Sequence, residues 1–366
     1  NPFKQSNIID SDAHVIETDR TWDHLEQSEI KYRPILTQEI PGKSPAGWTI
    51  NGKLTPSLIR KFEDDEIAKM SKVSNRQMFT PKSAREMDDI DLRIDHLDKL
   101  GIDIQILYPT MWLQPLTDDM GAQIALTKAY NSWLKSIFIN GKNRFRWACI
   151  LPTLNLEKSI IEMNKAKEFG CVAVFMRSFE GKKIMTDPYF YPIYKEAEKL
   201  DLAICVHIAN GNRENFDYFV NSPISISAKG FAITRIPAVI GCMWLLMSEI
   251  NSLFPNLRWG FIESAAQWIP WIFNEVVRRY NSNGLEVPKN LFKKNNIFIT
   301  CQNDDDLPWI LKYSGSNTLI LGTDYGHTDP STEIDAISKF KLRKDISEEE
   351  KNNILQKNPK QLYKIQ

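Results

Sequence analysis

The sequence has no excess of charge of either sign. Its 366 residues include 46 Lys and Arg and 46 Asp and Glu, so the formal net charge is zero. Nucleic-acid-binding proteins usually carry a basic excess. We therefore expect no nucleic-acid partner, and we expect a small-molecule ligand instead.

Cysteine is scarce and is not arranged in pairs. The five residues are Cys149, Cys171, Cys205, Cys242 and Cys301, and no two of them are spaced C-x-x-C. Their odd number and spacing argue against a disulfide scaffold or a cysteine-based metal site. Four lie in or beside apolar runs, so we interpret them as buried free thiols of a reduced, cytoplasmic protein.

Long apolar runs are also missing. The longest, residues 231–246, is interrupted by Arg235 and Pro237, and we interpret it as too short and too broken to span a bilayer. Residues 1–4 contain no apolar segment of the kind that signal peptides carry. We expect no membrane association.

No G-x-G-x-x-G follows an apolar run, so nothing indicates a dinucleotide-binding sheet. The sequence instead contains eight short apolar runs, rich in β-branched and aromatic residues, of the kind that a buried parallel sheet requires. The predicted strands are residues 8–15, 102–108, 146–151, 171–176, 202–208, 257–263, 297–300 and 318–322.

Helical patterns separate these strands. Apolar residues recur at helical spacing in residues 87–100, 156–169 and 189–200, and Gly101 and Gly170 follow the first two as stop signals. Alternation of strand and helix indicates a parallel α/β fold. Eight strands favour a closed barrel, so we predict one (β/α)8 TIM-barrel domain over residues 1–366.

Two segments interrupt this rhythm. Residues of about 19–85 are rich in Pro, Gly and charge, and residues 210–237 follow the fifth strand. We interpret both as loop insertions, after strands one and five, at the catalytic end of the barrel. The alternative is disordered linkers between domains, although Trp22 and Trp48 argue against disorder in the first. The charged tail, residues 348–360, is expected to be a solvated helix with little functional content.

Three of the five histidines, His14, His207 and His327, fall at or just after the ends of predicted strands. Catalytic residues of a TIM barrel lie at that end. Asp12 and His14 are two residues apart, so both side chains point to one face of their strand. A buried Asp needs a partner, which a metal ion would supply. The alternatives are an Asp–His hydrogen bond and, for His207, a core histidine.

Acidic residues end two further strands. Glu263 ends the sixth, and Asp324 follows the eighth with His327 three residues later. A carboxylate that caps the next helix is the structural alternative, and it fits Asp324 better than Glu263. His24 and His96 are interpreted as structural.

These residues form one predicted metal-ligand set: Asp12, His14, His207, Glu263, Asp324 and His327. Imidazole together with carboxylate suits zinc, manganese or iron. Six ligands exceed what one tetrahedral zinc needs. We therefore expect two divalent transition-metal ions per chain, with one ion plus an acid–base pair as the alternative.

Several segments resemble the amidohydrolase superfamily, in particular the relatives of aminocarboxymuconate-semialdehyde decarboxylase. The similar segments are Ile-Asp-Ser-Asp-Ala-His-Val at 9–15, the helix–strand junction at 97–103, the approach to His207 from 187, the block 254–270, and Leu-Gly-Thr-Asp-Tyr-Gly-His-Thr-Asp at 321–329. The resemblance covers residues 8 to about 335. It implies a barrel with metal ligands at His14, His207 and Asp324.

The sequence departs from the family pattern at two positions, and it also lacks a feature of other two-metal members. Asp12 replaces the first histidine of the usual His-x-His, and Glu263 stands where the decarboxylase has a histidine. Strand four ends in Met176-Arg177, so the carbamylated lysine of other two-metal members has no counterpart. Members with this pattern resemble two-metal hydrolases, whereas the decarboxylases resemble one-metal enzymes.

We therefore expect a hydrolase in which the metal activates water to attack the carbonyl of a small acidic or aromatic amide, ester or thioester. Asp324 would move the proton to the leaving group, with Glu263 and His327 as further catalytic groups. The alternative is a metal-dependent, non-oxidative decarboxylase of an aromatic or enoic acid. A non-catalytic binding barrel is disfavoured because none of the six ligands is missing.

Substrate binding is assigned to two cations and two aromatic residues. Arg177 and Arg235 would pair with a substrate carboxylate, unless they form surface ion pairs. Trp22 and Trp112 would line the pocket for an aromatic group, unless they only pack in the core. We also expect a homodimer.

Overall fold

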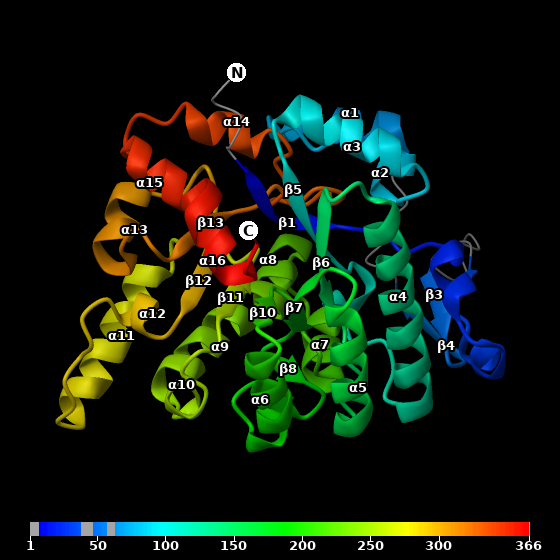
Figure 1. Ribbon diagram of the computed structural model, residues 1–366, viewed down its shortest axis with the longest axis horizontal. Coiled ribbons are helices and arrows are strands. Elements are labelled where there is room, and N and C mark those ends of the chain that lie inside the picture. The colour runs from blue at the N-terminus through cyan, green and yellow to red at the C-terminus, as the bar shows by residue number, and fades with distance from the viewer. Residues whose placement is uncertain (1–6, 38–46, 57–62, 366) are drawn as a thin grey trace.

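Eight parallel strands occupy the centre of the molecule and helices surround them (Figure 1). The computed structural model describes residues 7–37, 47–56 and 63–365. The strands pair in the order of the following list. They are β1 (Ile9–His14), β5 (Ile104–Tyr108), β6 (Phe145–Cys149), β7 (Cys171–Met176), β10 (Ala203–His207), β11 (Trp259–Ile262), β12 (Ile297–Cys301) and β13 (Leu319–Leu321).

All eight predicted strands are confirmed, and their ends differ from the prediction by at most two residues. The agreement follows from burial. Nearly every residue of these strands is buried, because the outer face packs against helices and the inner face fills the barrel. A strand that is buried on both faces has a continuous run of apolar residues in its sequence.

Backbone hydrogen bonds between β1 and the segment after β13 close the barrel. The carbonyl of Asp12 accepts from the N–H groups of Thr323 and Asp324 at 3.2 and 2.9 Å, and the N–H of His14 donates to Tyr325 at 2.7 Å. The predicted (β/α)8 barrel is therefore confirmed. Its closing seam passes directly through residues of the predicted metal site.

A buried polar network supports this seam. The carboxylate of Asp10 accepts from the backbone N–H and hydroxyl of Thr323 at 2.9 and 2.6 Å and from Gln105 at 2.8 Å. Arg93 donates to Gln105 and to the carbonyl of His14 at 3.0 Å. Burial raises the pKa of Asp10 to about 6. Each polar group in the network has partners, as buried polar groups require.

The outer helices begin and end largely as their sequences predict. Asp89 caps the N-terminus of α3 (Ile90–Leu100), where its carboxylate accepts from the N–H of Leu92. Gly101 caps the C-terminus with φ of +69°, the left-handed conformation that glycine adopts readily. The larger helices are α3 (Ile90–Leu100), α4 (Met120–Asn140), α5 (Leu156–Lys167), α6 (Tyr191–Lys199), α9 (Ile236–Met247), α11 (Ile269–Ser282) and α13 (Leu307–Ser314).

Shorter elements lie in the connections. They are η3 (Met111–Leu113), the hairpin of β8 (Phe179–Glu180) and β9 (Lys183–Ile184), η4 (Pro188–Phe190), α10 (Ile250–Leu253), α12 (Leu291–Lys294) and α14 (Ala336–Lys341).

The two predicted insertions follow β1 and β10, but they are more ordered than loops. The first contains η1 (Asp19–His24), η2 (Gln27–Tyr32), an antiparallel sheet of β2 (Ile35–Thr37), β3 (Gly47–Ile50) and β4 (Lys53–Pro56), and then α1 (Asp64–Ser74) and α2 (Lys82–Arg85). Of this insertion, residues 38–46 and 57–62 lie outside the described part of the chain. The second contains α7 (Arg213–Asn221), α8 (Ile226–Gly230) and a π-helical turn, η5 (Phe231–Arg235).

The prediction that this apolar run is too short and too broken to span a bilayer does not hold for the helix that contains it. The helix is continuous over Ala228–Met247, because the π-helical turn lets Ile236 donate to Phe231 just before Pro237, which has no N–H to donate. By length and composition alone this helix could cross a membrane. It is weak evidence for a span, because buried core helices meet the same criteria and 44% of its apolar window is buried.

The prediction of a solvated C-terminal tail is also wrong. α15 (Glu348–Asn352), a π-helical turn (Asn353–Lys357) and α16 (Asn358–Tyr363) lead back to the barrel, and the C-terminus lies in front of its centre in Figure 1. Ile354 and Leu355 within the predicted segment are buried, as are Leu362 and Tyr363 just beyond it. The hydroxyl of Tyr363 donates to the carbonyl of Ser11 and bonds the hydroxyl of Tyr108, each at 2.9 Å. The charged residues of the tail had concealed this apolar face.

Gly322 provides a test of the closing seam. A Cβ atom at this position would overlap the Cβ of Asp12 and lie 2.9 Å from its backbone nitrogen. We expect Gly322→Ala to lower the free energy of unfolding by about 1–3 kcal/mol through overpacking and to reduce metal binding, because Asp12 must move.

Gly230→Ala is the matched control, because a Cβ there meets nothing within 4 Å. It should leave stability unchanged or raise it by up to about 1 kcal/mol. Denaturant unfolding of both variants decides the matter, and equal stability of the two would contradict this account of the seam.

Candidate metal centre

The six predicted ligand residues meet at the C-terminal end of the barrel. Asp12 and His14 come from β1, His207 is the last residue of β10, and Glu263 directly follows β11. Asp324 and His327 follow β13. The structure groups His14, Glu263, Asp324 and His327 as one set of converging donor atoms, and Asp12, His14 and His207 as a second that shares His14.

Two imidazole nitrogens lie at the centre of the cluster. His14 Nε2 is 3.6 Å from Asp12 Oδ1, 3.8 Å from Glu263 Oε2 and 3.5 Å from Asp324 Oδ1. His207 Nε2 is 3.4 Å from Asp12 Oδ1 and 3.7 Å from Glu263 Oε2. The contact between His207 and Asp12 is a long hydrogen bond, and the other distances lie beyond hydrogen-bonding range. The donor atoms therefore converge on a common point without bonding one another tightly.

Several of these atoms are buried and unpartnered. Among the described residues, His14 Nε2 and both carboxylate oxygens of Glu263 have no hydrogen-bond partner. A buried polar atom without a partner is costly, and a buried carboxylate more so. A bound cation would compensate this cost, so the residues present fit a divalent metal ion.

The orientation of His14 fits a ligand role. Its Nδ1 donates to the carbonyl of Pro109 at 2.9 Å, which leaves the lone pair of Nε2 directed at the cluster. Burial lowers the pKa of His14 well below its ordinary value, and the neighbouring His327 and His207 lower it further. A neutral imidazole is the form that binds metals.

The carboxylates repel one another in the absence of a cation. Burial raises the pKa of Glu263 well above its ordinary value, and the charges of Asp324, Asp329 and Asp12 raise it further. Burial and the charges of Asp329 and Asp12 act on Asp324 in the same direction, although the hydroxyl of Thr332 donates to its Oδ2 at 2.6 Å. A bound cation would remove this repulsion.

The backbone at both acids is strained. Glu263 has φ of +60° and Asp324 has φ of +53°. Residues with a side chain rarely adopt this conformation, and each instance costs on the order of 1–3 kcal/mol. Such strain is concentrated at functional sites. Glycine would relieve it at these two positions, but glycine would carry no carboxylate.

The pairwise spacing of the donor atoms matches that of ligands on a metal ion. Zinc bonds to nitrogen and oxygen are about 2.0–2.2 Å long, so two ligands on a tetrahedral ion lie about 3.4 Å apart. The distances from the two imidazole nitrogens to the carboxylate oxygens run from 3.4 to 3.8 Å. The predicted metal-binding cluster is present, while the predicted pair of ions stays a prediction.

His327 lies at the edge of the cluster. Its ring stacks on His14 with centroids 3.7 Å apart, and its Nδ1 is 2.8 Å from Asp324 Oδ1. Its Nε2 bonds the hydroxyl of Thr110 at 3.0 Å. Burial lowers the pKa of His327.

Two residues of the site were missed by the sequence analysis, Thr110 and Glu17. The buried carboxylate of Glu17 accepts from the backbone N–H groups of Thr110 and Met111, both at 3.1 Å. Burial raises the pKa of Glu17 to about 7, although these N–H groups favour the carboxylate. Glu17 lies between β1 and the first insertion, and no periodicity in the sequence marked it.

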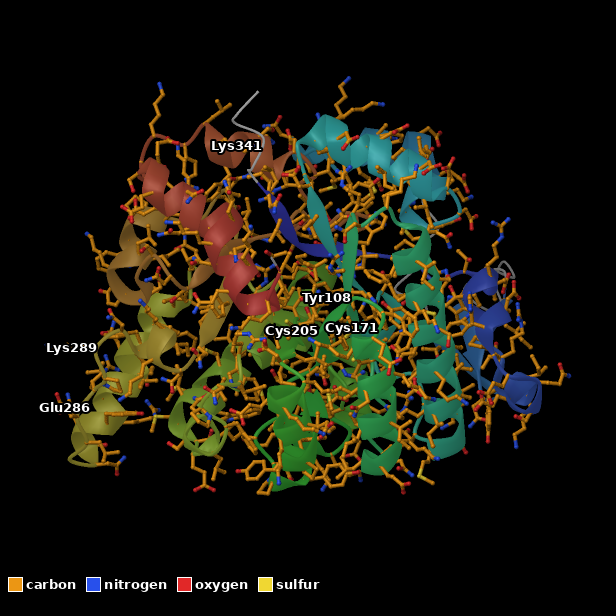
Figure 2. All side chains as sticks on the ribbon, in the orientation of Figure 1. Tyr108, Cys171, Cys205, Glu286, Lys289 and Lys341 are labelled. Carbon is orange, nitrogen blue, oxygen red and sulfur yellow. The ribbon has the colours of Figure 1, made fainter. Side chains whose placement is uncertain are left out.

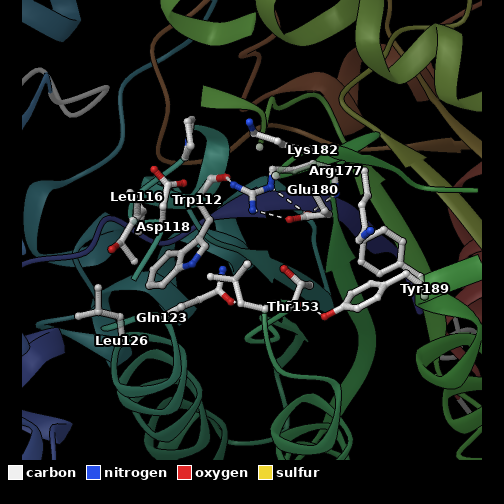
Figure 3. Close-up of a pocket in the computed structure, with 17 residues that line it drawn as sticks. Trp112, Leu116, Asp118, Gln123, Leu126, Thr153, Arg177, Glu180, Lys182 and Tyr189 are labelled. Atoms are coloured by element: carbon white, nitrogen blue, oxygen red, sulfur yellow. Dashed lines mark hydrogen bonds and ion pairs between the residues drawn. The ribbon is translucent and has the colours of Figure 1, made fainter. Parts of the chain in front are cut away.

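The predicted substrate residues Arg177 and Trp112 lie away from this cluster. Both line a cavity of about 260 Å³ between the loops after β5, β6 and β7 (Figure 3), and none of the six ligand residues is among its lining. Arg177 donates to both carboxylate oxygens of Glu180 and to the carbonyls of Trp112 and Gln114. A substrate carboxylate would have to displace Glu180.

The charged side chains around this cavity are paired. The ion pairs are Arg177–Glu180, Lys182–Glu214, Lys183–Asp187 and Arg213–Asp118. The unpartnered charge of the site lies at the metal cluster instead, and we place the chemistry there.

Arg235 has a different position. Its Nη2 donates to the hydroxyl of Ser331 at 2.7 Å, and its charge lowers the pKa of Glu263 slightly. The guanidinium therefore lies close enough for its charge to act on Glu263, and it acts on Asp305 as well. Trp22 is buried against Trp48 and Trp112, with ring centroids 6.2 and 6.1 Å away. Its packing matches the structural alternative, and its contact with substrate stays a prediction.

The remaining histidines and the cysteines lie outside the cluster. His96 is half-buried and bonds the hydroxyl of Tyr325 at 2.9 Å. All five cysteines are free and buried, as predicted. Figure 2 labels Cys171 and Cys205 in the interior, near Tyr108.

Relatives of this chain are found among known protein families and known proteins. The family model of the amidohydrolases matches residues 9–365. A 2-amino-3-carboxymuconate-6-semialdehyde decarboxylase from Dictyostelium discoideum is 24% identical over 304 residues, which is 76% of this chain and 79% of that protein.

Solved structures with 15–16% identity share the fold. An amidohydrolase from Mycobacterium avium subsp. paratuberculosis K-10 superposes with a TM-score of 0.78 at 15% identity and 99% coverage of both chains. A 5-carboxyvanillate decarboxylase from Novosphingobium aromaticivorans DSM 12444, complexed with manganese and 4-hydroxy-3-methoxy-5-nitrobenzoic acid, superposes with 0.67 at 16% identity, covering 100% of this chain and 98% of that one.

Metal content tests the cluster directly. We expect His207→Ala to lose most of its bound divalent metal, because alanine offers no donor atom to replace the imidazole. His24→Ala is the control, since His24 is a half-buried histidine outside the cluster. Elemental analysis of both proteins, purified in parallel, gives the answer. Metal retained at the wild-type level in His207→Ala would exclude His207 as a ligand.

Proposed function

The chain belongs to the amidohydrolase family, and from this premise we propose that it is a metal-dependent, non-oxidative decarboxylase of a small aromatic or enoic acid. This is the second of the two reactions expected from the sequence. The observation that carries the proposal is the spacing of the buried donor atoms, which suits one ion. The curated decarboxylase that matches three quarters of the chain supports the same reaction.

Four residues would hold the ion: Asp12, His14, His207 and Asp324. His14 Nε2 lies 3.6 Å from Asp12 Oδ1 and 3.5 Å from Asp324 Oδ1, and His207 Nε2 lies 3.4 Å from Asp12 Oδ1, so Asp12 and His14 connect the donors of the seam to the donor of β10. Bound there, a divalent ion would act as a Lewis acid toward the oxygens of a substrate acid. Manganese, zinc and iron all suit this mixture of imidazole and carboxylate.

Decarboxylation requires a proton at the carbon that loses the carboxylate. The bond from that carbon to the carboxylate carbon breaks, carbon dioxide leaves, and the electron pair remains on the unsaturated skeleton. A new bond to hydrogen then forms at the same carbon. The chain must therefore place a proton donor beside the metal ligands, and solvent must return the proton to that donor.

Glu263 is the residue we assign to this proton transfer. Both of its oxygens are buried and without a partner among the described residues, and Oε2 lies 3.8 Å from His14 Nε2 and 3.7 Å from His207 Nε2. The carboxyl group thus faces the same space as the ligands. In this assignment Glu263 acts on the substrate and the ion count is one.

Arg235 is the residue we assign to the substrate's charge. In the described part of the chain it has one hydrogen bond, to Ser331, so other guanidinium N–H groups remain for a carboxylate or phenolate. Its charge is felt at Glu263. Arg177 is a weaker choice, because Glu180 already occupies its donors.

Hydrolysis is the second candidate, and Glu263 is the observation that favours it. A fifth donor group beside four ligands could help to hold a second ion, as the sequence analysis expected. The amidohydrolase from Mycobacterium avium subsp. paratuberculosis also superposes well on this chain. The two candidates differ in the product released: carbon dioxide, or an amine, alcohol or thiol.

Glu263→Gln separates the two candidates. We expect this variant to keep the metal content of the wild type. Its rate of carbon dioxide release should fall by about 10²–10⁴-fold, because an amide cannot supply the proton. Release is measured with 5-carboxyvanillate and with 2-amino-3-carboxymuconate-6-semialdehyde.

Lys182→Gln is the control for a loss of charge away from the site, since Lys182 pairs with Glu214 at the protein surface. Two ions per wild-type chain, of which Glu263→Gln loses one, would favour the hydrolase. Cleavage of amides or esters with no carbon dioxide from any acid would refute the decarboxylase.

A further inference from the structure

The residues after β5 form a bracket around two of the site's imidazoles. We define this bracket as Pro109, Thr110 and Met111. The carbonyl of Pro109 accepts from His14 Nδ1 at 2.9 Å, and the hydroxyl of Thr110 bonds His327 Nε2 at 3.0 Å. One short segment thus contacts both rings of the His14–His327 stack.

The hydroxyl of Thr110 has one hydrogen and can therefore donate only one hydrogen bond. The oxygen lies 2.8 Å from the carbonyl of Val15, and a carbonyl can only accept. The hydroxyl donates to Val15, so toward His327 it acts as an acceptor. His327 Nε2 must then carry the hydrogen of the Thr110–His327 bond.

We propose that Thr110 is a positioning residue that holds His327 in the tautomer with its hydrogen on Nε2. The lone pair of His327 Nδ1 is thereby directed at Asp324, whose Oδ1 is 2.8 Å away. At that distance the two atoms share a proton, because two acceptor atoms without a hydrogen between them would repel each other. Thr110 therefore fixes which ring nitrogen serves the site, without itself touching substrate or metal.

Glu17 holds the bracket in place. Its two carboxylate oxygens accept separately from the N–H groups of Thr110 and Met111, both at 3.1 Å. Glu17 is 1% exposed, so water does not compete for these two hydrogen bonds. The position of the Thr110 hydroxyl is thus fixed by its bonds to Val15 and His327 and by the bond of Glu17 to the Thr110 backbone.

The consequence for turnover rests on the proposed function, because it requires a reaction at this site. The consequence for the tautomer does not. Thr110→Val keeps the shape of the side chain and removes the hydroxyl, Thr110→Ser keeps the hydroxyl, and Thr127→Val is a matched control. Within the described part of the chain, the buried hydroxyl of Thr127 bonds only carbonyls of α4.

The tautomer is measured by nitrogen NMR of the zinc-loaded protein with ¹⁵N-labelled histidine, with His327 assigned from the His327→Gln variant. We expect a slowly exchanging Nε2–H at His327 in the wild type, in Thr110→Ser and in Thr127→Val. We expect Thr110→Val to lose this protected signal. An unchanged His327 signal in Thr110→Val, or a wild-type hydrogen on Nδ1 alone, would overturn the proposal.

Kinetics and metal content complete the test. Thr110→Val should retain its zinc and lose about 10–100-fold in kcat, the usual effect of removing a group that orients a site residue, with KM little changed and with activity restored by serine. Loss of zinc in Thr110→Val would contradict the assignment, since it would make the hydroxyl a support for metal binding. If wild type releases no carbon dioxide, the proposed function fails while the NMR result still decides the role of Thr110.

Discussion

Closure of the barrel between β1 and the segment after β13 is the constraint on which the site depends. The carbonyl of Asp12 accepts from the N–H groups of Thr323 and Asp324, and His14 donates to Tyr325. These bonds place the side chains of Asp12, His14 and Asp324 side by side. Metal ligands that are more than 300 residues apart in sequence thus become neighbours because the first and last strands meet.

The seam is supported from within the fold by polar groups that make no contact with substrate in our account. The Asp10 network ties Thr323 to Gln105, and Gln105 to Arg93, which bonds the carbonyl of His14. Tyr363 approaches through the C-terminal helix and bonds Ser11 in β1. The metal site and the stability of the barrel therefore share the same hydrogen bonds.

Much of the fold and the metal cluster could be predicted from the sequence. The strands are continuous apolar runs, and a polar residue at the end of such a run, such as His207, stands out because little else explains it. Other features could not be predicted. The role of Thr110 depends on a three-dimensional contact with His327, and the buried face of the C-terminal tail was masked by charged neighbours. Arg177 was expected at the substrate, but the pairing with Glu180 depends on a local turn.

The central claim is that one divalent ion sits among Asp12, His14, His207 and Asp324. The most direct measurement is a crystal structure of the manganese-loaded protein with anomalous scattering data collected to locate the metal. The account predicts one anomalous peak per chain, about 2.0–2.3 Å from the nitrogen and oxygen donors of these four residues. Two peaks separated by about 3.5–4 Å, the spacing of a two-metal site, or a single peak away from His207, would contradict it.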